Sequence, residues 1–199
     1  MGMFDRFKRH SAVRHGDAEA AEAGLVAKVA RGDRVAFQAL YELYFGRLAR
    51  FLDRMLRGTA LIEEIINDTM LVVWQKAHSF DRSCKVSTWI FAIAYRQGLK
   101  AIHASDEAVE DDPDLQAGDA RMEPESIAMH QQMCEGVGAA LDALSFEQRV
   151  VVSLAYYHDM GYQEIADTMG CPLNTVKTRM FHARQRLKVL LSAHREEAA

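Results

Sequence analysis

Residues that interrupt helices are scarce in this sequence. It has three prolines and twelve glycines among 199 residues, and it has no long stretch in which polar and apolar residues alternate, as they do in a half-buried strand. Apolar residues make up 49% and charged residues 26% of the chain, a composition typical of folded globular proteins that argues against a disordered one. We therefore predict an all-α fold.

Long hydrophobic runs and closely spaced cysteines are also missing. No apolar run approaches the roughly 18 residues that a membrane helix needs, and residues 1–24 lack the apolar core of a signal peptide. We therefore expect a cytoplasmic protein without membrane insertion. Cys84, Cys134 and Cys171 are too far apart for a disulfide framework or a zinc site. We interpret them as free thiols, and whether any of them senses oxidation stays open.

Motifs of catalytic chemistry are absent as well. The eight histidines are scattered, without an HExxH pattern and without Cys and His pairs at metal-binding spacing. Neither a glycine-rich phosphate loop nor a serine or cysteine nucleophile motif occurs. We therefore predict a protein that is not an enzyme and that needs no metal or cofactor.

Charge is distributed unevenly along the chain. Residues 105–125 carry nine acidic residues and one arginine, whereas residues 174–195 carry six basic residues and no acidic one. The acidic stretch predicts a flexible linker over residues 104–126. It would join two small helical domains, over residues 25–103 and 127–195, and we expect residues 1–24 to form a disordered tail. Such charge segregation is typical of a protein with two different partners.

The first domain has the apolar periodicity of four amphipathic helices. Apolar residues recur at steps of three and four near residues 25–31, 37–55, 62–74 and 86–102. These helices would pack as a small bundle around a core of aromatic and branched aliphatic side chains.

The second domain contains a helix-turn-helix pattern from Tyr162 to Leu187. Ala166 allows two helices to cross closely, Gly170 provides a turn that favours positive φ, and Val176 returns to the core. The exposed face of the second helix is basic and rich in hydroxyl groups, and it can enter a major groove. We predict that it binds DNA through these residues, some at bases and some at phosphates: Asn174, Thr175, Lys177, Thr178, Arg179, Arg184 and Arg186.

Two helix starts are also visible in this domain. Ser145 followed by Gln148 forms a capping-box pattern. Asn174 or Thr175 is expected to cap the helix that follows Pro172.

Two other interpretations fit parts of these patterns. A conventional helix-turn-helix regulator would use its first domain to sense a ligand or to dimerise, and it would bind palindromic DNA without another protein. An adaptor would bind a protein partner and no DNA, an interpretation that the basic second helix disfavours.

Two sets of motifs resemble the extracytoplasmic-function (ECF, group 4) RNA polymerase sigma factors. Tyr162-Gln-Glu-Ile-Ala, Met169-Gly170, Asn174-Thr-Val-Lys-Thr-Arg179 and His182-Ala-Arg184 resemble region 4.2 of that family. Region 2 is resembled by Ala36-Phe37 with Leu40-Tyr41, by Glu63-Glu64-Ile65-Ile66-Asn67-Asp68-Thr69 and by Ser87-Thr88-Trp89-Ile90. The order of the motifs and the acidic linker between them agree with the family over roughly residues 25–190.

This resemblance implies an alternative sigma factor that directs promoter-specific initiation. Its partners would be core RNA polymerase, through the β′ coiled coil and the β flap, promoter DNA, and an anti-sigma factor that controls it. Region 2 would dock on the polymerase through Glu63, Glu64, Asn67, Asp68, Leu71 and Gln75. It would bind the −10 element through Lys85, Thr88, Phe91, Tyr95, Arg96 and Lys100, and region 4 would read the −35 element.

One segment departs from the family pattern. Family members commonly carry a run of arginines at the end of the fourth helix, but residues 95–103 hold only Arg96 and Lys100 as cations, and acidic residues follow. The resemblance therefore implies fewer phosphate contacts near the −10 element.

Overall fold

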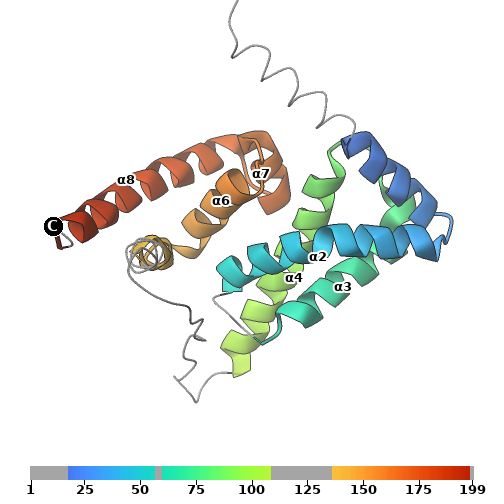
Figure 1. Ribbon diagram of the computed structural model, residues 1–199, viewed down its shortest axis with the longest axis horizontal. Helices are drawn as coiled ribbons and strands as arrows, with labels where there is room; N and C mark the ends of the chain where they lie inside the picture. The colour runs from blue at the N-terminus through green and yellow to red at the C-terminus, as the bar shows by residue number, and fades with distance from the viewer. Residues whose placement is uncertain (1–17, 57–59, 109–135, 198–199) are drawn as a thin grey trace, which may run out of the picture. The chain divides into compact units, whose positions relative to one another are not determined.

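The computed structural model describes residues 18–56, 60–108 and 136–197 of the chain. These residues are almost entirely helical and contain no strand, which confirms the all-α prediction. They form two compact units. The first is built mainly from helix 18–29, α2 (Arg34–Leu56), α3 (Ile62–Lys76), the 3-10 turn η1 (Ala77–Ser79) and α4 (Val86–Ala108), and the second from helix 136–142, α6 (Phe146–Tyr157), α7 (Tyr162–Met169) and α8 (Leu173–Glu197) (Figure 1).

Helices α2 and α3 run antiparallel in the first unit (Figure 1). The Tyr41 hydroxyl donates to Asn67 Oδ1 at 2.9 Å, and the rings of Phe37 and Trp74 form a T-shaped pair with centroids 5.1 Å apart. Burial of each large apolar side chain contributes roughly 1.5–3 kcal/mol to stability. The core of the unit holds fully buried residues from three helices: Tyr44, Leu48, Phe51, Ile66, Met70, Val73, Ile90 and Phe91.

Helix α2 starts after a tight turn that its sequence explains. Gly32 has a φ of 84°, a left-handed conformation that glycine adopts without strain. Asp33 follows it, and its Oδ1 accepts the N–H groups of Val35 and Ala36 at 2.9 and 3.0 Å. These bonds satisfy two of the free donors at the start of the helix.

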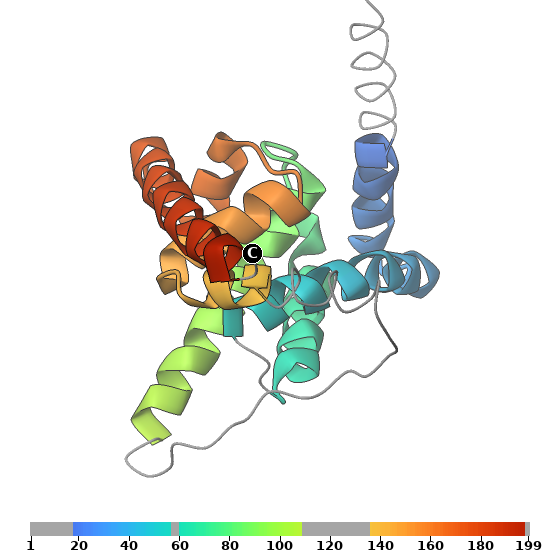
Figure 2. The ribbon, with the colours of Figure 1, turned by 60° about the vertical axis from the view of Figure 1, so that its left-hand side comes forward.

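The structure corrects the expectation of a disordered tail for residues 18–24. Residues 18–24 are helical and continue without a break to residue 29, as the blue helix that leads to α2 in Figure 2 shows. Val26 and Val29 are buried. The sequence prediction placed the boundary too late because residues 18–23 are alanines and glutamates, which have no apolar periodicity. Residues 1–17 lie outside the described residues.

Helix α4 is longer than its periodicity predicts. It continues to Ala108, so residues 104–108, which we expected to begin the linker, are helical instead. Ala104 and Ala108 lie in this stretch, and alanine is the strongest helix former. Residues 109–126 of the predicted linker lie outside the described residues.

The helix starts and the turn in the second unit follow local sequence rules. Gln148 N–H donates to Ser145 Oγ and Ser145 N–H donates to Gln148 Oε1, both at 3.4 Å, which confirms the capping box. Gly170 has a φ of 63° and ends α7, as its place in the pattern predicts. Helices α6, α7 and α8 enclose a small core that contains these buried residues: Val150, Val151, Leu154, Ile165, Val176, Met180 and Ala183.

The left-handed backbone at Gly170 leads to a prediction about stability. We expect Gly170→Ala to lower the free energy of unfolding by about 1 kcal/mol, because an alanine Cβ is strained at this φ. No heavy atom lies within 4 Å of the added Cβ, so the cost comes from the backbone alone. Chemical denaturation followed by circular dichroism measures the change.

Gly138→Ala is the matched control. Gly138 lies in helix 136–142, and a Cβ added there also meets no atom within 4 Å. We expect this variant to be as stable as the parent or up to about 1 kcal/mol more stable. Equal destabilisation by both substitutions would refute backbone strain as the cause.

Candidate nucleic-acid and protein interfaces

The N-terminal half of α8 presents polar side chains on one exposed face. Asn174, Lys177 and Thr178 are exposed, while Thr175 and Arg179 are half-buried. Val176 is fully buried and holds the opposite face of the helix against the core, as its position predicts. A helix held in this way, with amide, hydroxyl and ammonium groups outward, can reach base edges and phosphates in a major groove.

The expected cap of α8 is wrong. The helix begins at Leu173, and the N–H groups of Thr175 and Val176 donate to Pro172 O at 2.9 and 3.3 Å. Asn174 therefore lies inside the first turn. The structure instead uses Pro172, whose missing N–H costs nothing at a helix start.

Two of the arginines on α8 have partners inside their own unit. Arg184 Nε donates to the hydroxyl of Tyr156 on α6 at 3.2 Å, and Arg186 Nε donates to Ala143 O at 3.0 Å. Both side chains are exposed, so phosphate contact is compatible with these bonds. Their immediate effect is to hold the middle of α8 against the preceding helices.

Arg179 and the turn cysteine form a third contact of α8. The guanidinium of Arg179 lies 3.8 Å from the sulfur of Cys171. Cys84 and Cys171 are half-buried free thiols, as expected, and Cys134 lies outside the described residues. No cluster of three metal-binding side chains occurs within the described part of the chain.

Phe181 is an exposed aromatic residue that the sequence patterns did not single out. Its side chain is 57% exposed, beside the ring of His182. It follows Thr178 by three residues and Asn174 by seven, so the three lie on one face of α8. The helical spacing in the sequence could have revealed this exposure, because Phe181 does not fall on the helix face that carries the buried Val176 and Met180. An aromatic side chain here can contact the methyl group of a thymine.

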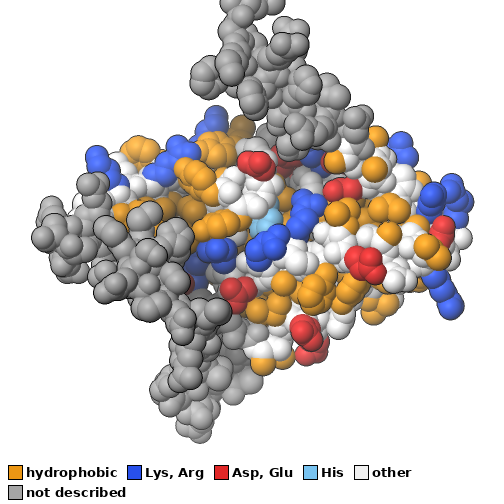
Figure 3. Space-filling model, in the orientation of Figure 1, with side chains coloured by type: hydrophobic (Ala, Val, Ile, Leu, Met, Phe, Trp, Pro, Cys, Tyr) orange, Lys and Arg blue, Asp and Glu red, His pale blue; other side chains and the backbone are white. Residues whose placement is uncertain are grey.

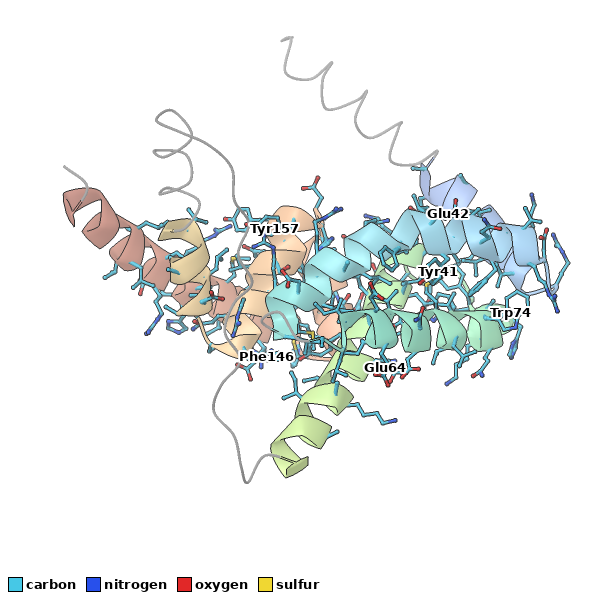
Figure 4. The ribbon with its side chains drawn as sticks, turned by 60° about the horizontal axis from the view of Figure 1, so that its bottom comes forward. Tyr41, Glu42, Glu64, Trp74, Phe146 and Tyr157 are labelled. Carbon is cyan, nitrogen blue, oxygen red and sulfur yellow. The ribbon has the colours of Figure 1, made fainter. Side chains whose placement is uncertain are left out.

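The outer face of α3 combines acidic and apolar groups. All six residues assigned to polymerase docking are exposed, and Leu71 is 52% exposed although it is a large apolar side chain. Figure 4 shows Glu64 pointing away from the unit and Tyr41 between α2 and α3. Figure 3 shows acidic and hydrophobic side chains next to one another on the face that carries α3.

The inner face of α3 explains why these groups point outward. Ile65, Ile66, Met70 and Val73 are buried, and they occupy the arc of the helix that faces the core. Asn67 accepts the hydrogen bond of Tyr41, so its amide has a defined orientation beside the acidic groups.

Three of the six residues assigned to the −10 element require correction. Thr88, Phe91 and Tyr95 are 2%, 0% and 8% exposed. The rings of Phe91 and Phe51 form a T-shaped pair with centroids 5.2 Å apart. These side chains therefore belong to the interior, because α4 is enclosed on more sides than its apolar periodicity suggests. The three cations assigned to this element are all exposed: Lys85, Arg96 and Lys100.

The segment before α4 has an ordered turn with a ring pair beside it. Asp81 Oδ1 accepts the N–H of Ser83 at 2.9 Å, and this bond lowers the pKa of the Asp81 carboxyl. Arg82 between them has a φ of 63°. Trp89 is half-buried and packs against Phe80 with ring centroids 5.1 Å apart.

Comparison with known proteins identifies both units. Residues 40–106 match the Sigma-70 region 2 family, and residues 135–187 match Sigma-70 region 4. The chain is 31% identical over 161 residues to the ECF RNA polymerase sigma factor RpoE of Cereibacter sphaeroides. This alignment covers 80% of this chain and 88% of RpoE. It is 30% identical over 171 residues to SigK of Mycobacterium tuberculosis, an alignment that covers 82% of this chain and 90% of SigK.

The chain belongs to the ECF RNA polymerase sigma factors. A sigma factor of this family binds core RNA polymerase and directs initiation at specific promoters. The fold of this sigma factor is shared by two solved complexes. CnrH bound to the cytosolic domain of CnrY has a TM-score of 0.65 and 21% identity, covering 87% of this chain and 98% of CnrH. RpoE of Bartonella quintana bound to the anti-sigma factor NepR has a TM-score of 0.62 and 22% identity, covering 78% and 96%.

Within the described parts of the chain, no helix combines the length and hydropathy needed to cross a membrane.

The buried hydroxyl of Thr88 gives a test of its corrected assignment. Thr88 Oγ1 has no hydrogen-bond partner among the described residues, and valine has a similar branched shape. We expect Thr88→Val to raise the free energy of unfolding by about 1 kcal/mol, because an unsatisfied polar group is removed. Promoter-dependent transcription should be unchanged. Thermal denaturation and run-off transcription measure the two effects.

Thr69→Val is the matched control for this substitution. Thr69 is also fully buried, but its Oγ1 donates to Ile65 O at 2.7 Å. We expect this variant to lose stability by about 1 kcal/mol, since a made hydrogen bond disappears. If the Thr88→Val protein is stable but fails in transcription, Thr88 contributes to DNA binding and its assignment to the interior alone is wrong.

Proposed function

We propose that this sigma factor docks on the β′ coiled coil of core polymerase through the outer face of α3. The support is the combination of exposed acidic side chains and an exposed Leu71 on one helix face. An apolar group surrounded by charges is typical of a surface that a partner covers. The residues of this docking face are Glu63, Glu64, Asn67, Asp68, Leu71 and Gln75.

Reading of the −35 element is assigned to α8. We propose that Asn174, Thr175, Thr178 and Phe181 approach base edges, while Lys177 and Arg179 approach phosphates. Arg184 and Arg186 would reach phosphates at the far end of the face, held in place by their bonds to Tyr156 and Ala143. The observation that carries this assignment is the single exposed face shared by the first group.

Binding of the −10 element is assigned to α4 and the segment before it. The exposed cations Lys85, Arg96 and Lys100 would attract the strand. The half-buried pair of Phe80 and Trp89 would offer an aromatic edge for an unstacked base. Few cations follow on α4, so we expect promoter opening to depend strongly on the −10 sequence.

Regulation and cellular context complete the proposal. We place this protein in group 4, as a non-enzymatic cytoplasmic subunit that also contacts the β flap. An anti-sigma factor would control it, by analogy with RpoE of Bartonella quintana, whose solved complex contains the anti-sigma factor NepR. Leu71 and Phe181 remain exposed on the two functional faces, so a partner that covers them would block both.

The docking proposal predicts the effect of a charge reversal. We expect Asp68→Arg to weaken binding to core RNA polymerase at least tenfold, which corresponds to about 1.4 kcal/mol, because a repulsive cation enters an acidic face. Glu42→Arg makes the same charge change on α2, and Figure 4 shows Glu42 on the opposite side of α2 and α3 from Glu64. Fluorescence titration should give parent-like affinity for this control. Equal loss in both would contradict docking through α3.

The −35 proposal predicts two distinct patterns of loss. Phe181→Ala should weaken binding to the cognate −35 duplex by about 1–2 kcal/mol and leave binding to scrambled DNA unchanged, because it removes a base contact. Lys177→Ala should weaken both duplexes alike and reduce the salt dependence by about one phosphate contact. Holoenzyme titrations at several salt concentrations separate the patterns, and a reversed outcome would exchange the two roles.

A further inference from the structure

Helix 18–29 presents two carboxylates to the interior of the first unit. Glu19, Glu22, Val26 and Val29 follow one another at helical spacing, so they form one stripe. Val26 and Val29 are buried, and the side chain of Glu22 is only 14% exposed. The match to the region 2 family begins at residue 40, so this helix and its glutamates lie outside the matched segment.

Glu22 fastens the helix to α2. It accepts the hydrogen bond of the buried Tyr44 hydroxyl and lies 3.4 Å from Arg47 Nη1. The Arg47 guanidinium also lies over the rings of Tyr44 and Phe91, at 4.6 and 5.7 Å from their centroids. Burial, followed by the nearby Glu22 charge, raises the pKa of the Tyr44 hydroxyl well above its ordinary range. Tyr44 therefore remains a hydrogen-bond donor to Glu22 at all physiological pH values.

Glu19 reaches a different helix. Its Oε1 accepts the backbone N–H of Val86 at 2.9 Å, and Val86 is the fully buried first residue of α4. The first turn of α4 contains no acidic residue of its own. A carboxylate from a residue 67 positions earlier therefore occupies the positive end of this helix.

We propose that Glu19 is a positioning residue for −10 recognition. By holding the first N–H of α4, it fixes where the helix begins and how Lys85 and residues 80–84 approach it. This inference rests on the proposed role of α4 and that segment in binding the −10 element. Without the carboxylate, the N–H group would be satisfied by water or by any nearby DNA phosphate, because a free helix start binds anions without regard to sequence. In this proposal, helix 18–29 contributes to −10 recognition by positioning the start of α4.

The test compares binding to single-stranded DNA within the holoenzyme. The probes are a non-template-strand oligonucleotide covering the −10 region of a promoter that the parent holoenzyme transcribes, and a scrambled oligonucleotide of the same composition. We expect Glu19→Ala to reduce the ratio of the two affinities about tenfold, as for the loss of a hydrogen bond to a charged group. Affinity for core polymerase should stay within about twofold of the parent.

Two variants separate positioning from a loss of structure. Glu19→Gln keeps an oxygen acceptor of the same length, so it should retain most of the preference for the −10 strand. Lys28→Ala changes an exposed residue of the same helix and should match the parent. If Glu19→Ala fails to bind core polymerase, Glu19→Asp tests the positioning role instead. Its shorter carboxylate leaves the Glu22 contacts in place, and it should still lower the ratio of the two DNA affinities.

The outcomes distinguish this inference from the function on which it rests. A parent holoenzyme without preference for the −10 strand would overturn the assignment of α4 to that element. A parent with clear preference, together with Glu19→Ala and Glu19→Asp variants that keep it and only melt at lower temperature, would overturn the positioning role. Loss of preference in both of these variants, with recovery in Glu19→Gln, is the expected result.

Discussion

The buried hydroxyl of Tyr44 is the constraint on which the first unit depends. Its side chain has no exposed surface, and an unsatisfied hydroxyl in that position would cost roughly 1–3 kcal/mol. The partner that satisfies it is Glu22, so helix 18–29 must pack against α2. Once the helix is there, Glu19 lies beside the start of α4 and bonds to Val86. A single buried polar group thus connects the order of the N-terminal helix to the position of the helix assigned to the −10 element.

The faces that we propose for function are those that the core of each unit leaves exposed. In α3, Ile66, Met70 and Val73 are buried in the core, whereas the acidic residues and Leu71 are exposed. In α8, Val176 and Met180 are buried, and the face with Phe181 remains. Leu71 and Phe181 lie outside these cores, and we propose that macromolecular partners cover them.

Charge alone does not distinguish structural from recognition residues on α8. Arg184 and Arg186 belong to the same basic segment as Lys177, but they brace the helix through Tyr156 and the carbonyl of Ala143. Their bonds keep the exposed face of α8 in one orientation. A rigid helix face is a requirement for reading bases, because hydrogen bonds to base edges tolerate little displacement.

Local chemistry determined what the sequence by itself could predict. The turn at Gly170, the capping box at Ser145 and the outward face of α3 depend on residues close in sequence, whose helical spacing is regular. The failures share a cause in long-range packing. Glu19 finds its partner 67 residues away. The alanines and glutamates of residues 18–23 favour a helix locally, but they carry no apolar periodicity that shows what the helix packs against. Thr88, Phe91 and Tyr95 were assigned to DNA contact because the apolar periodicity of one helix cannot show that α4 is enclosed on several sides. Only the assembled tertiary structure decides that enclosure.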